Sequence, residues 1–538
     1  MLFSFTGNNR RKAGGMMRMP DWDWFGFTPK EAFFLGEDEE ERNNATEDGY
    51  GGSNVPPKLD GFTPTESLEE NKKQLDALFH KEINMDYIRR EFYCGKIKVL
   101  LAFIDGLTNS MIVDDMLLRP LIQHPCEGID DALRRVLPIN NISVATDGKQ
   151  MVNSILEGDA VVFFDGDARA ITLDVKSYDK RTVGETINEK VVKGPQQGFV
   201  ENMRTNITLI RSIVRVPDLV SQIMPTGGDN NMKCAVMYRK GVASEQLVQR
   251  VIEKIKGISD VGFVLGGGMM EQLMKEDRRC ILPRTLQTER PDRAAAYLTQ
   301  GHIALVCDGY PFVMVLPITF FSLMQTSEDY FINPVFATIE RIIRYASLFI
   351  SMLLPGIYVA LVLFHQKMLP IEFILSSLAS RQLIALPVFL EILLMSIVFE
   401  LLREASIRVQ SGINQTLGIV GGLILGQAAV SANLVSPIAI IVVSTAGLAS
   451  FAIPDFSLQM ALYYVRFIFL GAALLGGFWG ILLVFIPLCA YLCSIKSYGV
   501  PYFTPVAPKT RSNRDLIIKG NITRGGDIPD YIRGGGKK

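Results

Sequence analysis

Residue types that commonly build metal and catalytic centres are scarce in this chain. It has only four histidines, and its seven cysteines include no CxxC pair and no nearby histidine. Zinc sites need several such ligands at short, regular spacings. The sequence therefore predicts no metal site, no cofactor and free cysteines rather than a disulfide framework. The residues concerned are His80, His124, His302 and His365, with Cys94, Cys126, Cys234, Cys280, Cys307, Cys489 and Cys493.

An excess of positive charge is also missing. The formal net charge is −1 over 538 residues, whereas a nucleic-acid-binding protein needs a basic surface. The sequence thus argues against nucleic acid as a partner. The first 20 residues carry Arg10, Arg11 and Lys12 but no apolar core, so we expect no secretory signal and a cytoplasmic N-terminal region.

Charge is absent altogether from long stretches of the last third. Residues 413–453 and 467–495 contain no charged residue, and 345–364 and 383–402 are two further apolar segments. A membrane helix needs about 20 such residues, so we expect a transmembrane domain over 326–495 with about five or six segments, followed by a basic tail over 496–538.

The final apolar run leaves the topology open. Residues 463–495 could form a hairpin, a re-entrant pair or one long tilted helix, with Gly476 and Gly477 near the centre. Basic residues follow or precede the other segments at Arg341, Arg344, Arg403 and Arg408. These groups and the basic tail share one side of the membrane only if 463–495 crosses twice or not at all.

Upstream, short apolar runs alternate with amphipathic helical patterns, which is typical of an α/β fold. We expect a flexible acidic extension over 1–79, a first soluble α/β subdomain over 80–192 and a second over 193–325. The fold class is therefore two α/β subdomains followed by a polytopic helical membrane domain.

Four features could suggest chemistry in the soluble part. Three apolar runs, 98–104, 160–164 and 303–307, each end in Asp-Gly, and Gly266, Gly267 and Gly268 precede a helical pattern. Asp-Gly is common turn chemistry, and the glycines lack the spacing of phosphate-binding loops. No nucleophile, base or metal set accompanies them, so we predict turns, no catalytic residue and no enzyme.

Two carboxylates fall within the second apolar segment. Glu391 lies close to its middle, and Glu400 lies near its end. A carboxylate in hydrocarbon costs several kcal/mol unless it is paired or neutral. Glu391 should face protein or water, either as part of an ion path or gate, or as a carboxyl that bonds a neighbouring helix.

The third segment carries the most specific pattern. Gly418, Gly422 and Gly426 recur every four residues, a stripe that allows close approach of another helix. Its other face is polar at the ends and apolar in the middle, as in a hydrophobic constriction of a pore. Ordinary small-residue packing explains the pattern equally well. The candidate pore face comprises Thr416, Val420, Leu423, Gln427 and Ser431.

Several strings together resemble one family, in its order, from about residue 85 to 508. They are Lys193-Gly-Pro-Gln-Gln-Gly-Phe199 with the following 206–215 helix, Thr288-Glu-Arg-Pro-Asp292, Cys307-Asp-Gly-Tyr-Pro311, Ser327-Glu-Asp-Tyr330, Leu402-Arg-Glu-Ala405, Ile419-Val-Gly-Gly422 with Leu425-Gly-Gln-Ala-Ala-Val430, and Gly499-Val-Pro-Tyr502. The chain resembles the A subunit of GerA-type spore germinant receptors, a group that includes the related stage V sporulation subunit.

This resemblance implies a two-part cytoplasmic N-terminal region and a membrane domain in the spore inner membrane. It also implies assembly with a transporter-like B subunit and a lipoprotein C subunit. The A subunit of that family looks like a ring-forming homo-oligomeric channel that opens when the B subunit binds nutrient and releases monovalent cations. Two other functions are a secondary transporter, which would need repeated membrane halves, and a non-conducting scaffold or signal-transducing subunit of the same receptor.

Overall fold

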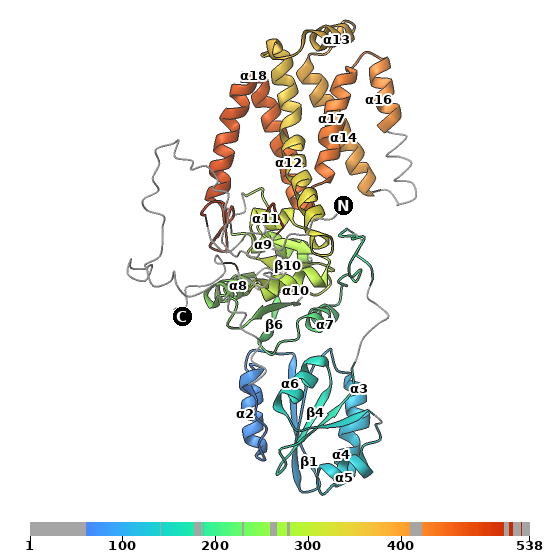
Figure 1. The fold of residues 1–538 in the computed structure, drawn as a ribbon, viewed down its shortest axis with the longest axis vertical. Coiled ribbons are helices and arrows are strands. Elements are labelled where there is room, and N and C mark those ends of the chain that lie inside the picture. The colour runs from blue at the N-terminus through green and yellow to red at the C-terminus, as the bar shows by residue number, and fades with distance from the viewer. Residues whose placement is uncertain are drawn as a thin grey trace, which may run out of the picture. The chain divides into compact units, whose positions relative to one another are not determined.

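The computed structural model describes residues 61–139, 141–176, 184–186, 188–228, 231–258, 266–276, 280–408, 422–509, 516–519 and 529. Two units built on β-sheets precede a helical region that the structure describes over residues 334–408 and 422–494 (Figure 1). The α/β part of the prediction is confirmed.

The first unit is a five-stranded antiparallel sheet with helices on both faces. Its strand order is β1-β2-β4-β5-β3. Along β2, Leu100, Ala102 and Ile104 pack with α2 and α6, whereas alternate residues pack with the helices that follow β2. Its elements are α2 (Leu68–Leu78), β1 (Tyr87–Cys94), β2 (Ile97–Ile104), α3 (Ser110–Val113), a π-helical turn (Asp114–Leu118), α4 (Arg119–Gln123), α5 (Ile129–Asp131), a second π-helical turn (Ala132–Val136), β3 (Ile142–Ala145), α6 (Gly148–Glu157), β4 (Ala160–Phe164) and β5 (Ala170–Leu173).

The second unit repeats this topology. Its order is β6-β7-β9-β10-β8, which is the order of the first sheet with each strand shifted by five, and every neighbouring pair is again antiparallel. Helices α7 and α10 cover one face, and α8 and α9 cover the other. Its elements are α7 (Met203–Ile213), β6 (Leu219–Thr226), β7 (Met232–Arg239), α8 (Glu245–Ile258), α9 (Gly266–Met274), β8 (Leu286–Thr288), α10 (Pro291–Thr299), β9 (Ile303–Cys307) and β10 (Val313–Leu316).

Matching hydrogen bonds strengthen the case for an internal duplication. Asn71 in α2 exchanges two hydrogen bonds with the backbone of Thr65, at 2.8 and 2.6 Å, and Asn206 in α7 does the same with Val200, at 2.8 and 2.5 Å. Both asparagines sit four residues after the N-cap, and both partners sit two residues before it. Each side chain thus fixes the chain just before a helix by satisfying both backbone polar groups of one residue.

The Asp-Gly pairs after β4 and β9 serve the same purpose. Asp165 accepts a hydrogen bond from the N–H of Leu68, the first residue of α2, and Asp308 accepts one from Met203, the first residue of α7, each at 3.2 Å. The glycines that follow adopt positive φ, 90° at Gly166 and 73° at Gly309. These two aspartates therefore hold helix starts, as the prediction of structural turns expects.

Two observations differ from the expected boundaries. Helix α2 falls within the predicted extension, and its Leu68 and Leu75 are buried against the first sheet. The segment LEENKKQLDAL is too polar to show a helical period. In the predicted tail, β11 (Lys496–Ser497) and β12 (Val500–Pro501) form a short hairpin, and Tyr502 beyond it is buried.

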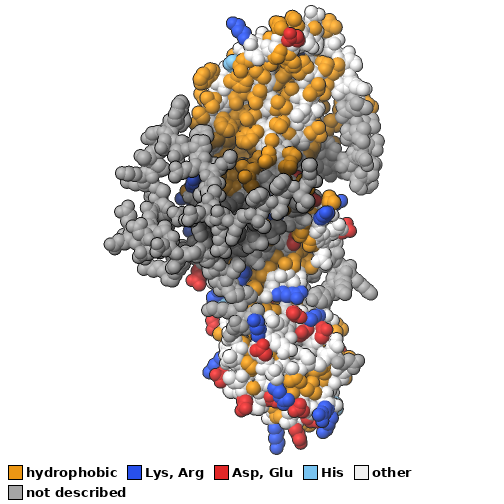
Figure 2. Space-filling model, in the orientation of Figure 1, with side chains coloured by type: hydrophobic (Ala, Val, Ile, Leu, Met, Phe, Trp, Pro, Cys, Tyr) orange, Lys and Arg blue, Asp and Glu red, His pale blue; other side chains and the backbone are white. Residues whose placement is uncertain are grey.

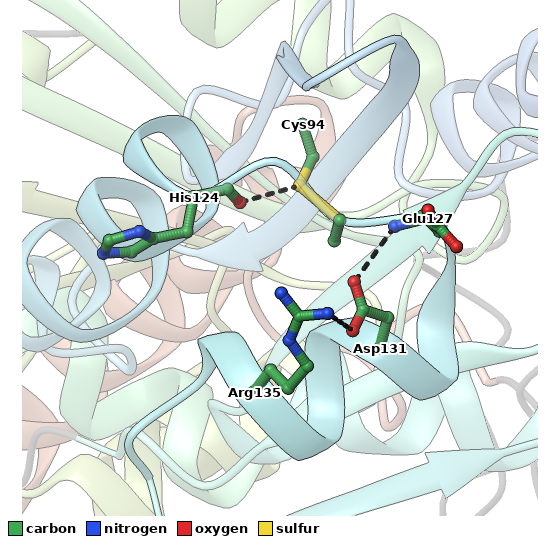
Figure 3. Close-up of a disulfide and its surroundings, with 6 residues drawn as sticks. Cys94, His124, Glu127, Asp131 and Arg135 are labelled. Atoms are coloured by element: carbon green, nitrogen blue, oxygen red, sulfur yellow. Dashed lines mark hydrogen bonds and ion pairs between the residues drawn. A yellow bond between two sulfur atoms is a disulfide. The ribbon is translucent and has the colours of Figure 1, made fainter.

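A disulfide corrects the prediction of free cysteines. Cys94, at the end of β1, is bonded to Cys126, and their Cα atoms lie 5.9 Å apart (Figure 3). The two are 32 residues apart in the sequence, so the proximity arises only when the turn after α4 folds back onto the sheet. Cys234, Cys280, Cys307, Cys489 and Cys493 are free.

Apolar side chains dominate the outer surface of the helical region (Figure 2). Within the described residues, two of its helices are long and apolar enough to cross a membrane, α12 (Pro334–Leu363) and α18 (Phe456–Ser494). The other elements after the second sheet are α11 (Phe320–Met324), a 3₁₀ turn (Ser327–Tyr330), a second 3₁₀ turn (Gln366–Met368), α13 (Ile371–Arg381), α14 (Val388–Arg408), α16 (Gly422–Ser431) and α17 (Pro437–Phe451).

Helix α18 folds back on itself at Gly476 and Gly477, where the backbone is not helical and Gly477 has a φ of 57°. The ring centroids of Phe469 and Phe485 lie 6.5 Å apart, whereas 16 residues of straight helix would separate them by roughly 24 Å. The run is therefore a hairpin, and one long tilted helix is excluded.

Candidate functional site

A junction of charged residues connects the second sheet unit to α12. Asp329 is fully buried in the 3₁₀ turn Ser327–Tyr330. It accepts a hydrogen bond from Arg341 Nε at 2.8 Å and from Arg344 Nη1 at 2.8 Å, and both arginines lie in α12. Burial alone would raise the pKa of Asp329, but the two guanidiniums outweigh it and the pKa is lowered. Asp329 is therefore held as a carboxylate.

The C-terminal segment closes the same junction. Lys519 donates a hydrogen bond to the carbonyl of Asp329, and its ammonium lies 4.2 Å from the ring centroid of Tyr330. Arg341 Nη1 donates to the carbonyl of Leu516 at 3.4 Å. Three parts of the chain thus meet here: the end of the second sheet unit, the start of α12 and residues 516–519.

A second network holds the segment between the sheet units. Arg290 donates to the carbonyls of Glu189 and Pro195 at 3.2 and 2.8 Å and pairs with Asp292. The neighbouring Arg293 pairs with the Glu189 carboxylate at 2.5 Å and donates to the carbonyl of Gln325 at 2.7 Å. Two strings separated in the sequence, 193–199 and 288–292, therefore come together beside the junction.

Glycine is required at one point of this network. Gly194 has a φ of 130°, and a Cβ placed there would lie 2.7 Å from the ring of Phe331. The N–H of Val192 donates to Glu328 Oε1 at 3.3 Å. The segment between the sheets is thereby fixed directly to the turn that carries Asp329.

Glu391 is fully buried in α14 and has two partners. Its carboxylate lies 2.9 Å from Arg381 Nη2, in α13, and accepts a hydrogen bond at 3.0 Å from the N–H of Ser436, the N-cap of α17. Three helices are joined by this one side chain. Glu400, half-buried further along α14, forms an ion pair with Arg403 within the same helix.

The predicted pore face and glycine stripe fall largely outside the described residues. This holds for Thr416, Gly418 and Val420. Gly422 and Leu423 begin α16, and Ser431 ends it. Within α16, Ile424, Leu425 and Gln427 are exposed, and a Cβ at Gly426 would meet no atom within 4 Å. No side chain of the chain's described part covers Gly426.

Tighter packing occurs at two other glycines. A Cβ at Gly447 in α17 would lie 2.4 Å from the ring of Phe399 in α14. One at Gly356 in α12 would lie 3.2 Å from the carbonyl oxygen of Phe469 in α18. Both are single glycines in apolar segments, so no repeated stripe signals them.

A buried charge in the helical region escaped the sequence analysis. Arg466 in α18 is 2% exposed and lies within the run 463–495, which we treated as apolar. The signal was present, since Arg466 is the only charged residue of α18 and lies near the middle of its first arm. Among the described residues, no group of three or more His, Cys, Asp or Glu could hold a metal ion.

Known proteins are similar to this chain over most of its length. The model of the family described as "Bacillus/Clostridium GerA spore germination protein" matches residues 73–529. The chain belongs to the GerA family. Its strings 288–292 and 327–330, which the resemblance singled out, are the ones that build the two polar networks.

Relatives in Bacillus subtilis span most of the chain. Spore germination protein KA is 32% identical over 86% of this chain and 85% of its own length. Spore germination protein A1 is 36% identical over 72% of this chain and 80% of its own. The uncharacterized membrane protein YfkQ is 35% identical over 88% and 93%.

A solved structure is also similar to part of this chain. It is the N-terminal domain of the A subunit of the Bacillus megaterium spore germinant receptor GerK3. It is 23% identical, covers 48% of this chain and 97% of its own length, and has a TM-score of 0.36.

Proposed function

We propose that this chain is the A subunit of a spore germinant receptor and forms an oligomeric ion channel that releases monovalent cations when nutrient is sensed. The proposed partners are a transporter-like B subunit, a lipoprotein C subunit and further copies of the chain. The proposed location is the spore inner membrane, with the two sheet units on the cytoplasmic side.

The proposed membrane topology has six crossings: α12, α14, the uncharged segment 413–431 that includes α16, α17 and the two arms of α18. The hairpin at Gly476 and Gly477 supports it, because an even number of crossings leaves the basic residues before α12, after α14 and after α18 on one side. A transporter is less well supported. A transporter is expected to have discontinuous helices at matching positions of two repeated membrane halves, and the sequence shows no such repeat.

The observation that carries the channel proposal is the uncovered side of α16. In a single chain, Ile424 is 58% exposed and Leu425 is 45% exposed, and Gly426 has open space beside it. In a ring of subunits, one part of such a helix packs on a neighbouring subunit and another part faces the pore. Thr416, Val420, Leu423 and Gln427 are the proposed pore-lining residues.

Ion flux in liposomes tests this function. We expect the purified full-length chain, with its partner subunits added in a parallel sample, to release trapped monovalent cations. Replacing Val420 by Ala should widen the constriction and cause leakage without nutrient. Val443→Ala, at a buried position of α17, is the matched control and should not leak. Assembled protein that never conducts, with or without Val420→Ala, would favour the scaffold.

A further inference from the structure

Arg466 is a full positive charge inside an apolar helix bundle. Its guanidinium lies 5.6 Å from the ring centroid of Tyr463, and it donates two hydrogen bonds to backbone carbonyls of other helices. Nε donates to Ser351 of α12 at 2.6 Å, and Nη2 donates to Ala446 of α17 at 3.3 Å. Such a residue is costly to bury, so a specific reason for its presence is expected.

The backbone carbonyl of Ser351 lacks the hydrogen-bond donor that it would normally have within its own helix. In an α-helix it would accept a hydrogen bond from the N–H of residue 355, four positions later. Residue 355 is proline, which has no N–H, so this carbonyl loses its partner within the helix. Ser351 is 1% exposed, and a buried carbonyl without a partner costs about 1–3 kcal/mol. Arg466 supplies the donor that Pro355 removes.

The close packing of α12 against α18 explains how Arg466 can reach the Ser351 carbonyl. Gly356, directly after Pro355, allows the backbone of α18 to approach, with the Phe469 carbonyl oxygen 3.2 Å from where a Cβ would be. Phe469 is three residues after Arg466 and so lies on the same side of α18. The close contact therefore brings the guanidinium within reach of the freed carbonyl.

We propose that Arg466 is a positioning residue for α12. By supplying the hydrogen bond that Pro355 cannot donate, it fixes the conformation of α12 around this proline. Pro355 and Arg466 thus act as one unit that joins α12, α17 and α18. Helix α12 begins at the Asp329 junction and ends beside the α18 hairpin, where Gly477 meets Phe364 and His365. The unit thus lies between the junction and the far end of the bundle.

A rescue experiment tests the pairing. In the full-length protein in detergent, Arg466→Leu should lower the folded-to-unfolded ratio by roughly tenfold to a hundredfold, because the Ser351 carbonyl loses the donor that Arg466 supplies. Pro355→Ala restores the N–H at position 355. The double variant Pro355→Ala/Arg466→Leu should therefore recover most of the loss.

Pro487 provides the matched control. It is the proline inside α18, and the carbonyl that it frees is that of Leu483, a residue whose side chain is 74% exposed. Pro487→Ala/Arg466→Leu should remain as unstable as Arg466→Leu alone. Equal rescue by both alanine variants, or none by Pro355→Ala, would overturn the pairing.

A distance measurement tests the positioning role separately from stability. Spin labels at Leu363 in α12 and Leu475 in α18 report the separation of these two helices beyond Pro355. The exposed Cys489 and Cys493 are first replaced by Ser. We expect Arg466→Lys to broaden the distance distribution and Pro355→Ala/Arg466→Lys to narrow it again. An unchanged distribution in Arg466→Lys would contradict positioning. None of these readouts depends on conduction, so a chain that shows the rescue but no ion flux would refute only the proposed channel.

Discussion

At the scale of single residues, the helical region is built around a few buried charges that all have partners. Removing one member of a buried ion pair destabilises the folded state by more than the intact pair contributes to its stability, because the other charge stays buried without a partner. Glu391 with Arg381, and Asp329 with Arg341, are such pairs. Their substitutions should therefore have large and interpretable effects.

For Glu391, charge and hydrogen bonding can be separated. Glu391→Gln keeps an acceptor for the Ser436 N–H but removes the charge beside Arg381, so it should assemble and change the response to nutrient or pH. Glu391→Leu removes both the charge and the acceptor, and it should lower the free energy of unfolding by about 3 kcal/mol or more. Thermal unfolding and spore germination rates measure these effects. Glu400→Gln is the control, and parental behaviour of both Glu391 variants would reduce the residue to ordinary packing.

For Asp329, the lowered pKa predicts a pH dependence. A carboxylate whose pKa is lowered by folding adds stability above its unfolded pKa of about 3.8, and this stability is lost as the pH falls below that value. Asp329→Asn should cost about 3 kcal/mol at pH 7 and weaken the acid dependence of unfolding.

The control for this prediction shares one arginine. Glu340 pairs with Arg344 at 3.3 Å but is 45% exposed, so Glu340→Gln should change stability by less than about 1 kcal/mol. Denaturant titrations at pH 3 and pH 7 make the comparison. A steep acid transition retained in Asp329→Asn would mean that another carboxylate is responsible.

At the scale of elements, the strands that were predicted correctly are those marked by a local sequence pattern. Strands β4 and β9 match the predicted 160–164 and 303–307 to the residue, because each is a fully apolar run closed by Asp-Gly. Helix α2 was missed because most of its residues are polar, and its start is held by Asn71 and Asp165 rather than by an apolar stripe. Helix α14 begins at Val388, later than expected, directly after Pro387.

Contacts made by distant segments were beyond the sequence. The Cys94–Cys126 disulfide, the partners of Glu391 and the bond from Arg466 to Ser351 each join elements whose proximity depends on the complete fold. The duplication of the sheet units was also hidden, since the two copies share positions of hydrogen-bonding residues rather than a long common string.

The close contact of α14 and α17 gives a prediction at this scale. Gly447→Leu places a side chain where the Phe399 ring already lies, 2.4 Å from a Cβ position, so overpacking should cost about 1–3 kcal/mol. Gly426→Leu enters open space in the single chain and should not destabilise the monomer. It should instead lower the yield of oligomer if α16 meets a second subunit. Light scattering of both variants distinguishes the two effects.

At the scale of the whole molecule, the chain passes from the sheets into the helical region and returns. After α18, the β11–β12 hairpin packs on the second sheet unit: Ser497 Oγ donates to the Arg284 carbonyl at 2.8 Å, and the Tyr498 hydroxyl donates to that of Met274 at 2.6 Å. The second unit is thus joined to the helices covalently through α12 and by hydrogen bonds through the hairpin that follows α18. Movement of that unit should therefore reach both α12 and α18.

Arg250 offers a way to loosen only the returning connection. Its Nη1 donates to the carbonyl of Tyr498 at 2.8 Å, from α8 to the hairpin. Arg250→Ala should cost about 1–3 kcal/mol, the effect of leaving a buried acceptor without its donor. Arg204→Ala is the matched control, since Arg204 is 74% exposed in its ion pair with Asp105 and should contribute less than about 1 kcal/mol.

Hydrogen exchange should locate the effect of Arg250→Ala. If the hairpin couples the second unit to α18, amides of β11, β12 and the second arm of α18 should exchange faster in this variant, while those of the first sheet remain protected. Exchange that increases evenly over both sheet units would instead assign Arg250 to the stability of the soluble half alone. In the second of the two duplicated units, this returning hairpin adds a contact with the helices beyond the one made through α12.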